Sequence, residues 1–99
     1  MFTDCKKLKS FNSEMPNLKF ANSMFINCNL INFEKDMPNL TFGVNMFYGN
    51  KKLERFNCKL PKLEESDFMF GNCINLTSFE SDLVSLVDAR YMFNKCNLK

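Results

Sequence analysis

Apolar residues recur along this chain with a period of 22 or 23 residues. The dipeptide Met-Phe marks the period and begins at Met1, Met24, Met46, Met69 and Met92. A period in this range is typical of stacked repeats, because one repeat cannot bury its apolar face alone and its neighbours cover it. The sequence therefore predicts a single array with repeats at 1–23, 24–45, 46–68 and 69–91 and a partial repeat at 92–99.

Most apolar residues fall into columns when the repeats are aligned on this methionine, with one residue deleted after Cys28 and another after Cys96. Position eight is always leucine, position eleven is always phenylalanine, and positions fifteen and eighteen hold methionine or leucine. In the third repeat these residues are Leu53, Phe56, Leu60 and Leu63. We expect the columns to form a core that runs through the array.

Each repeat divides into three predicted elements. The pattern Leu-x-x-Phe-x, at 53–57 and 76–80, predicts a strand that pairs in parallel with its copies. Proline ends this pairing in the turns at 14–18 and 36–40, because it lacks an N–H group. The following stretch, such as 22–28, begins with polar N-cap candidates and predicts short helical or 3-10 turns. The expected fold class is an α/β solenoid, with parallel strands on the concave face and these turns on the convex face.

Leu-x-x-Phe, a proline turn and then Met-Phe-x-x-Cys-x-x-Leu resembles the BspA-type leucine-rich repeat family, and the resemblance covers the whole chain. The matched residues are Phe2, Cys5, Leu8 and Phe11, then Phe25, Cys28, Leu30 and Phe33, then Phe70, Cys73, Leu76 and Phe79. The third repeat departs from the pattern with Asn50 in place of cysteine. The family often has another aliphatic residue two positions after the strand phenylalanine, where this chain has Ser13, Lys35, Cys58 and Ser81. The resemblance implies a leucine-rich repeat fold with binding or adhesion roles and no common enzymatic activity.

Composition and charge exclude several classes of protein. With 45% hydrophobic and 24% charged residues and little glycine or proline, the sequence is typical of a folded domain. It contains no apolar run of about 18 residues, so no membrane insertion is expected. A net charge of +2 is too small for the basic stripe of a nucleic-acid-binding protein. The chain starts inside the repeat pattern, without a signal peptide. Either it is a piece of a longer array or its initiator methionine also serves as the first repeat methionine, and we expect the former because neither end resembles a capping repeat.

The cysteines are expected to be structural. Cys5, Cys28, Cys73 and Cys96 share one column, where a free thiol behaves as a small apolar residue. A full repeat separates them and histidine is absent, so no zinc site or other metal site is expected. Helices would place neighbouring members about 10 Å apart, beyond the Cα distance of about 7 Å that a disulfide spans. Cys58 lies outside the column, and we expect partial burial beside the strand.

The sequence offers no support for catalysis or a cofactor. It has no histidine for a general base, and no nucleophile elbow or phosphate-binding glycine-rich loop. Acidic residues do recur in columns, but Asn57 and Lys59 interrupt these columns and are expected to form cross-strand pairs with the acids. A solvated strand face is the simpler interpretation, and we expect no enzyme.

Strand alternation predicts the candidate binding surface. If position eleven faces the core, the residues on either side of it project outward, and the rows continue past the strand. The predicted surface comprises Ser10, Asn12, Glu14, Asn32, Glu34, Asp36, Arg55, Asn57, Lys59, Ser78, Glu80 and Asp82. Only Arg55 among them is of a type that dominates protein interfaces. Tyr48 and Tyr91 lie on the other side of the repeat and are alternative anchors.

Two functions remain open. The first is a non-catalytic interaction or adhesion module that binds a protein or a glycan through its repeat surface. Family resemblance then implies the cell surface or secretion. The second is a structural or accessory component of a larger assembly, such as a virion, joined to neighbouring subunits through the open ends of the array, because apolar patches there mark contact sites.

Overall fold

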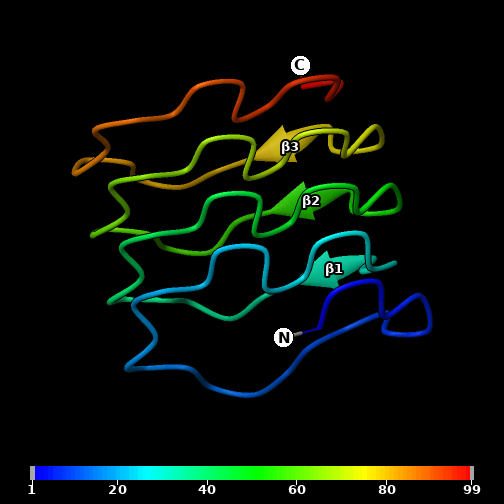
Figure 1. The fold of residues 1–99 in the computed structure, drawn as a ribbon, viewed down its shortest axis with the longest axis horizontal. Helices are drawn as coiled ribbons and strands as arrows, with labels where there is room; N and C mark the ends of the chain where they lie inside the picture. Colours follow the sequence, from blue (N-terminus) through cyan, green and yellow to red (C-terminus); the bar gives the residue numbers. More distant parts are fainter. Residues whose placement is uncertain (1, 99) are drawn as a thin grey trace.

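A computed structural model describes residues 2–98, so Met1 of the first Met-Phe pair and Lys99 of the partial repeat lie outside it. Its regular structure is a parallel sheet of three strands, β1 (Asn32–Phe33), β2 (Arg55–Phe56) and β3 (Ser78–Phe79). The sheet is open, with the order β1-β2-β3. Asn32 pairs with Arg55, and Arg55 pairs with Ser78, so equivalent residues of successive repeats lie side by side (Figure 1). The predicted parallel pairing is confirmed.

The strands are shorter than the five residues predicted. The N–H of Leu53 donates to Asn50 O and that of Leu76 to Cys73 O, so these leucines belong to the preceding turn. Pairing therefore begins two residues later, at Arg55 and Ser78. Because each strand has only two residues, strict alternation of side chains does not extend far beyond it.

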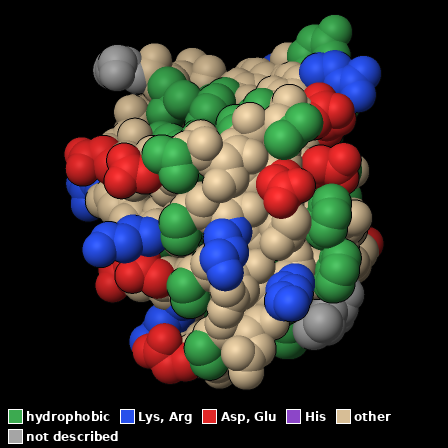
Figure 2. Space-filling view, turned by 90° about the vertical axis from the view of Figure 1, so that its left-hand side faces the viewer, with side chains coloured by type: hydrophobic (Ala, Val, Ile, Leu, Met, Phe, Trp, Pro, Cys, Tyr) green, Lys and Arg blue, Asp and Glu red, His purple; other side chains and the backbone are tan. Residues whose placement is uncertain are grey.

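Proline turns reverse the chain after β1 and β2, at Pro38 and Pro61, whereas Val84 takes the equivalent place in the turn after β3. The N–H of Leu40 donates to Met37 O across the turn at Pro38, which is the hydrogen bond of a β-turn with proline in its second position. A second series of parallel bridges follows these turns and links Phe42 to Phe20 and to Glu65. Figure 2 shows the side of the molecule where the chain reverses, with acidic and basic side chains interspersed across it.

The predicted helical or 3-10 turns are wrong, because residues 2–98 contain no helix. In the segments around the second, third and fourth Met-Phe pairs, successive backbone N–H groups donate alternately to a carbonyl nearby in the same segment and to a carbonyl of the next repeat. Ile26 donates to Ser23 O within its own repeat, whereas Phe25 donates to Met46 O and Asn27 to Tyr48 O of the next repeat. A helix would use all of these donors within one segment. Direct bonding between repeats therefore replaces the helix with a run of tight turns.

Left-handed backbone conformations also exclude a helix at this point. Two positions in each repeat have positive φ, the residue before the repeat methionine and the residue three after it. Asn45 and Asn72 at 59° are favourable choices, because asparagine tolerates this region. Phe68 at 56° and Tyr91 at 55° are bulky residues for which the region is strained.

The core is built from the predicted columns. Two columns of phenylalanine alternate through it, one from the Met-Phe pairs and one from the strands. Within a column the rings stack, as Phe47 does on Phe70 at 5.3 Å between centroids, and between columns they meet edge to face, as Phe47 does with Phe56 at 5.3 Å. Both geometries are favourable for aromatic pairs. Phe20 stacks on Phe42 at 5.2 Å between centroids but lies outside the core, since 69% of it is exposed.

Candidate functional site

The rows predicted on the strand face lie at the surface. Ser78 is half-buried and the other eleven predicted site residues are exposed. Those eleven are Ser10, Asn12, Glu14, Asn32, Glu34, Asp36, Arg55, Asn57, Lys59, Glu80 and Asp82. The outward direction follows from the inward direction of the strand phenylalanines, of which Phe33 is 2% and Phe56 0% exposed.

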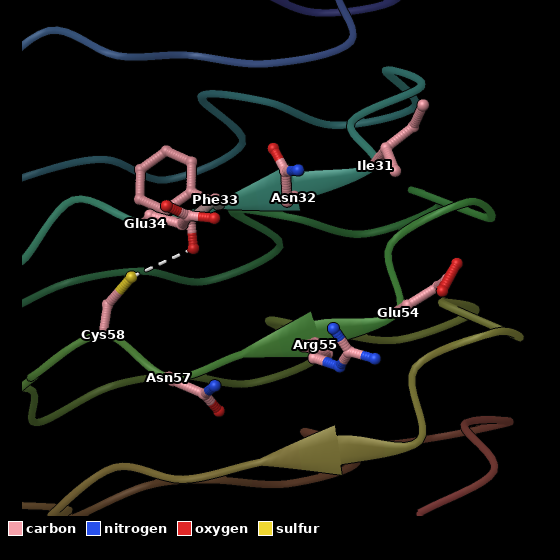
Figure 3. Close-up of a pocket in the computed structure, with 8 residues that line it drawn as sticks. All are labelled: Ile31, Asn32, Phe33, Glu34, Glu54, Arg55, Asn57 and Cys58. Atoms are coloured by element: carbon pink, nitrogen blue, oxygen red, sulfur yellow. Dashed lines mark hydrogen bonds between the residues drawn. The ribbon is translucent and has the colours of Figure 1, made fainter.

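A groove of about 420 Å³ lies on this face between β1 and β2 (Figure 3). It collects four of the predicted residues, Asn32, Glu34, Arg55 and Asn57. The other eight lie outside its lining: Ser10, Asn12, Glu14, Asp36, Lys59, Ser78, Glu80 and Asp82. The structure thus reduces a surface of many polar residues to one concave site on the second and third repeats.

Sequence reasoning missed four residues that line the groove, namely Ile31, Phe33, Glu54 and Cys58. Ile31 and Glu54 occupy position nine, which alternation from the strand phenylalanine would turn inward. The chain bends at Ile31 immediately before β1, and 41% of this side chain is exposed. Its apolar character at an otherwise polar column, where Lys9, Glu54 and Thr77 are its equivalents, was a signal that could have identified it.

Arg55 supplies the positive charge of the groove. The ion pairs formed among residues 2–98 are Lys35–Glu14, Arg90–Asp67 and Arg90–Asp88, so the Arg55 guanidinium enters none of them. Glu34 and Glu54 contribute carboxylates to the same lining. A guanidinium with five N–H donors is suited to hold a carboxylate through two parallel hydrogen bonds.

The acidic columns are paired differently from the prediction. Asp36 Oδ1 accepts the backbone N–H of Lys59 at 2.8 Å, so the main chain rather than the ammonium group satisfies this oxygen. Glu14 pairs with Lys35 at 3.0 Å, with 75% of the Glu14 side chain exposed. These contacts tie one repeat to the next along the edge of the strand face.

Cys58 lies at the inner edge of the groove, and only 2% of it is exposed. Its thiol donates to Phe33 O at 3.2 Å (Figure 3). Burial, with smaller contributions from Asp36 and Glu34, raises the pKa of Cys58 to about 12. The thiol is therefore protonated near neutral pH and is a poor nucleophile. Its burial exceeds the partial burial predicted.

The cysteine column lies on the side of the molecule formed by the tight turns around the Met-Phe pairs (the turn side). Cys28 and Cys73 are 0% exposed, whereas Cys5 and Cys96 are half-buried. The thiol of Cys73 donates to Phe47 O at 3.1 Å and that of Cys96 to Phe70 O at 3.0 Å. The predicted spacing of about 10 Å is wrong, because it assumed helix packing. Without helices, successive repeats are hydrogen-bonded directly to one another.

An aromatic cluster covers part of the turn side. Tyr91, which is 65% exposed, stacks on Phe68 with ring centroids 5.2 Å apart. Tyr48 meets Phe68 edge to face at 6.4 Å. The Tyr48 ring lies directly over Gly71, where a Cβ atom would come within 2.8 Å of it. The two tyrosines therefore lie on one surface, where each contacts Phe68. This surface is separate from the polar strand face.

Within the described part of the chain, no three His, Cys, Asp or Glu side chains gather as metal ligands. Residues 2–98 also include no helix with the length and apolar character needed to cross a bilayer. No protein-family model, curated protein or solved structure matches the chain.

Proposed function

We propose that the chain is a leucine-rich-repeat solenoid and acts as a non-catalytic interaction or adhesion module, whose ligand binds in the groove between β1 and β2. The observation that carries this proposal is the position of the groove. It forms where the outward rows of the second and third repeats meet, and it contains Arg55, the interface-type residue of those rows. The step of 23 residues between paired strands supports the solenoid.

The lining favours a ligand that presents a carboxylate, either an acidic side chain of a protein or an acidic sugar of a glycan. Arg55 offers paired donors for this group, and the amides of Asn32 and Asn57 offer further hydrogen bonds beside it. Ile31 adds an apolar edge against which the rest of the ligand can pack. Glu34 and Glu54 repel a second acid, so a ligand with one carboxylate beside neutral or basic groups fits best.

The experiment compares ligand capture by the wild-type chain with capture by groove variants, using one peptide-display library and one glycan array. Arg55→Ala combined with Lys59→Ala removes the two cations of these rows, and we expect at least a tenfold loss of affinity for the captured ligand. Arg55→Lys keeps the charge but loses the paired donors, so it should bind with intermediate affinity. Lys52→Ala is the matched control, because this exposed lysine lies outside the groove. Unchanged binding by the double variant would overturn the proposal.

The second candidate is a structural role in a larger assembly. Leu83, Leu86 and Phe93 pack against the core but remain half-buried along one rim of the molecule, next to the open edge of the sheet at β3. A neighbouring subunit seated there would cover apolar side chains and extend the sheet. Sedimentation over a wide concentration range tests this role. Self-association that Leu86→Glu abolishes supports it, and a monomer at all concentrations contradicts it for contacts between copies of the chain.

A further inference from the structure

The cysteine column brings two pairs of thiols together. In the first pair, Cys28 Sγ donates to Phe2 O at 2.8 Å, and the backbone N–H of Cys5 donates to the same oxygen at 3.2 Å. In the second, Cys96 Sγ donates to Phe70 O at 3.0 Å, and the N–H of Cys73 donates to that oxygen at 3.2 Å. Within each pair, the sulfur of one cysteine is two hydrogen-bond lengths from the backbone of the other.

The distance between successive repeats at this point suits a disulfide. Three residues before each cysteine, the Phe2 and Phe25 rings stack at 5.4 Å and the Phe70 and Phe93 rings at 5.7 Å. Directly hydrogen-bonded parallel neighbours have a backbone spacing of about 4.8 Å. A disulfide requires Cα atoms about 4.4–6.8 Å apart. Both measures of spacing place neighbouring cysteines of the column within reach of each other.

We propose that the column is a site of oxidation that forms two disulfides, Cys5–Cys28 and Cys73–Cys96, each joining two successive repeats. The stacking permits only this pairing. Asn50 occupies the column in the third repeat, so Cys28 and Cys73 are separated by a whole repeat. Cys58 lies on the strand side, where its thiol bonds to Phe33 O instead.

Oxidation leaves no buried carbonyl without a partner. Three oxygens accept the thiol hydrogen bonds, Phe2 O, Phe47 O and Phe70 O, and each also accepts a backbone N–H. Losing the weak S–H donor therefore does not incur the cost of an unsatisfied acceptor. The thiols of Cys28 and Cys96 already point toward the repeat of their partner. The Cys73 thiol points to Phe47 O in the third repeat, so it must rotate toward Cys96 before the second disulfide can form.

The reaction is thiol–disulfide exchange with a small-molecule disulfide such as oxidised glutathione. The thiolate of Cys5 or Cys96, the half-buried member of its pair, attacks the reagent, forms a mixed disulfide and releases one thiolate. The buried partner, Cys28 or Cys73, then attacks the protein sulfur of this mixed disulfide and releases the second thiolate. Each pair loses two electrons and two protons, and the reagent is reduced to two thiols.

The two disulfides would divide the molecule into bridged flanks and an unbridged centre. One joins the first and second repeats and the other joins the fourth and the start of the fifth, whereas the third repeat, which carries Arg55, stays uncrosslinked. The proposal does not depend on ligand binding at the groove. Disulfide mapping tests it without any ligand, so its failure is distinct from a failure of the proposed function.

The test refolds the reduced, denatured chain in a glutathione redox buffer at about pH 8.5, near the ordinary pKa of a thiol. Remaining thiols are then alkylated and the peptides mapped by mass spectrometry. We expect the protein to lose four hydrogen masses, with Cys58 as the one alkylated cysteine and with peptides linking Cys5 to Cys28 and Cys73 to Cys96. The thermal midpoint of the oxidised protein should exceed that of the reduced protein by several degrees. Alkylation of all five cysteines, or a different pairing, would overturn the proposal.

Variants separate the two bridges. Cys28→Ser should leave Cys5 alkylated while the Cys73–Cys96 bridge still forms. Should this buried substitution prevent folding, Cys5→Ser at the half-buried position gives the same readout from the other partner. Cys58→Ser is the matched control and should leave both bridges unchanged. A bridge from Cys5 to Cys73 or Cys96 in the Cys28→Ser chain would show that proximity in the fold does not select the pairing.

Discussion

Asn50 Oδ1 accepts the backbone N–H of Leu30 at 3.1 Å, and this contact explains two irregularities of the repeat at once. In the first, third and fourth repeats, the leucine at position eight follows the cysteine-column residue by three positions. Its N–H donates to the carbonyl oxygen of that residue, as Leu53 does to Asn50 O. The deletion after Cys28 removes that turn, and the amide of Leu30 is buried. Asn50 supplies the missing acceptor, while its Nδ2 donates to Phe25 O at 2.8 Å, the place that a cysteine thiol takes in other repeats.

Replacing Asn50 with cysteine should therefore destabilise the protein. The thiol can still donate to Phe25 O, but the N–H of Leu30 loses its acceptor in a buried place. We expect the free energy of unfolding to fall by about 1–3 kcal/mol, the cost of an unsatisfied buried donor. Urea denaturation under reducing conditions measures the change.

Restoring the missing residue should rescue the variant. Insertion of one lysine between Cys28 and Asn29 recreates the spacing of the first repeat, so Leu30 regains a partner within its own turn. The insertion combined with Asn50→Cys should recover most of the lost stability, and the cycle of variants gives the coupling energy. Additive effects of the two changes would contradict the coupling. Cys73→Asn is the reciprocal control. It places a side-chain amide oxygen in a buried position where the leucine of the preceding repeat, Leu53, already donates its N–H to Asn50 O, so the new oxygen gains no such partner.

Phe56→Ala should reduce the free energy of unfolding by about 3–5 kcal/mol, as expected for a large core truncation. The ring is 0% exposed and contacts Phe70 edge to face at 4.8 Å. The same substitution at Phe20, which is 69% exposed, should cost less than about 1 kcal/mol and serves as the control. Equal losses at the two positions would refute the assignment of the strand column to the core.

Gly71→Ala should destabilise the turn side through a steric clash. The new Cβ would lie 2.8 Å from Cδ2 of the Tyr48 ring, which must move away from its contact with Phe68. We expect a loss of about 1–3 kcal/mol, typical of overpacking. Tyr48→Ala removes the obstacle, so Gly71→Ala should cost much less in that background. A double-mutant cycle by thermal unfolding tests this, and an unchanged cost in the Tyr48→Ala background would exclude the clash as the cause.

Stability should decline at alkaline pH because of the buried thiols. Burial raises the pKa of Cys58 and of Cys73 from 9.0 to about 12. Between these values the folded chain keeps protons that the unfolded chain has released, so the free energy of unfolding falls as the pH rises. The slope is at most about 1.4 kcal/mol per pH unit for each thiol. Urea denaturation of the reduced protein between about pH 9 and 10.5 should give a shallower decline for Cys58→Ser than for wild type, and equal slopes would contradict the assignment.

Much of the core was predictable because it is a repeated local pattern. Leu53, Leu60 and Leu63 are all 0% exposed, as their columns predicted. The direction of Arg55 followed from the burial of Phe56 next to it. The groove was harder to predict from the sequence, because Ile31 and Glu54 line it only where the backbone bends next to two short strands.

The sequence by itself determined the period, the residues that share a column and the polar rows between them, because burial of an apolar face is imposed in every repeat alike. Only the tertiary structure decided how the repeats are joined. Backbone N–H groups of Phe25 and Asn27 donate to the next repeat instead of to their own segment, and this choice removes the predicted helices. The same choice places the Cys28 thiol within hydrogen-bond distance of Phe2 O in the preceding repeat. Periodicity cannot distinguish these outcomes, because a helix and a run of turns can bury the same Met-Phe pair.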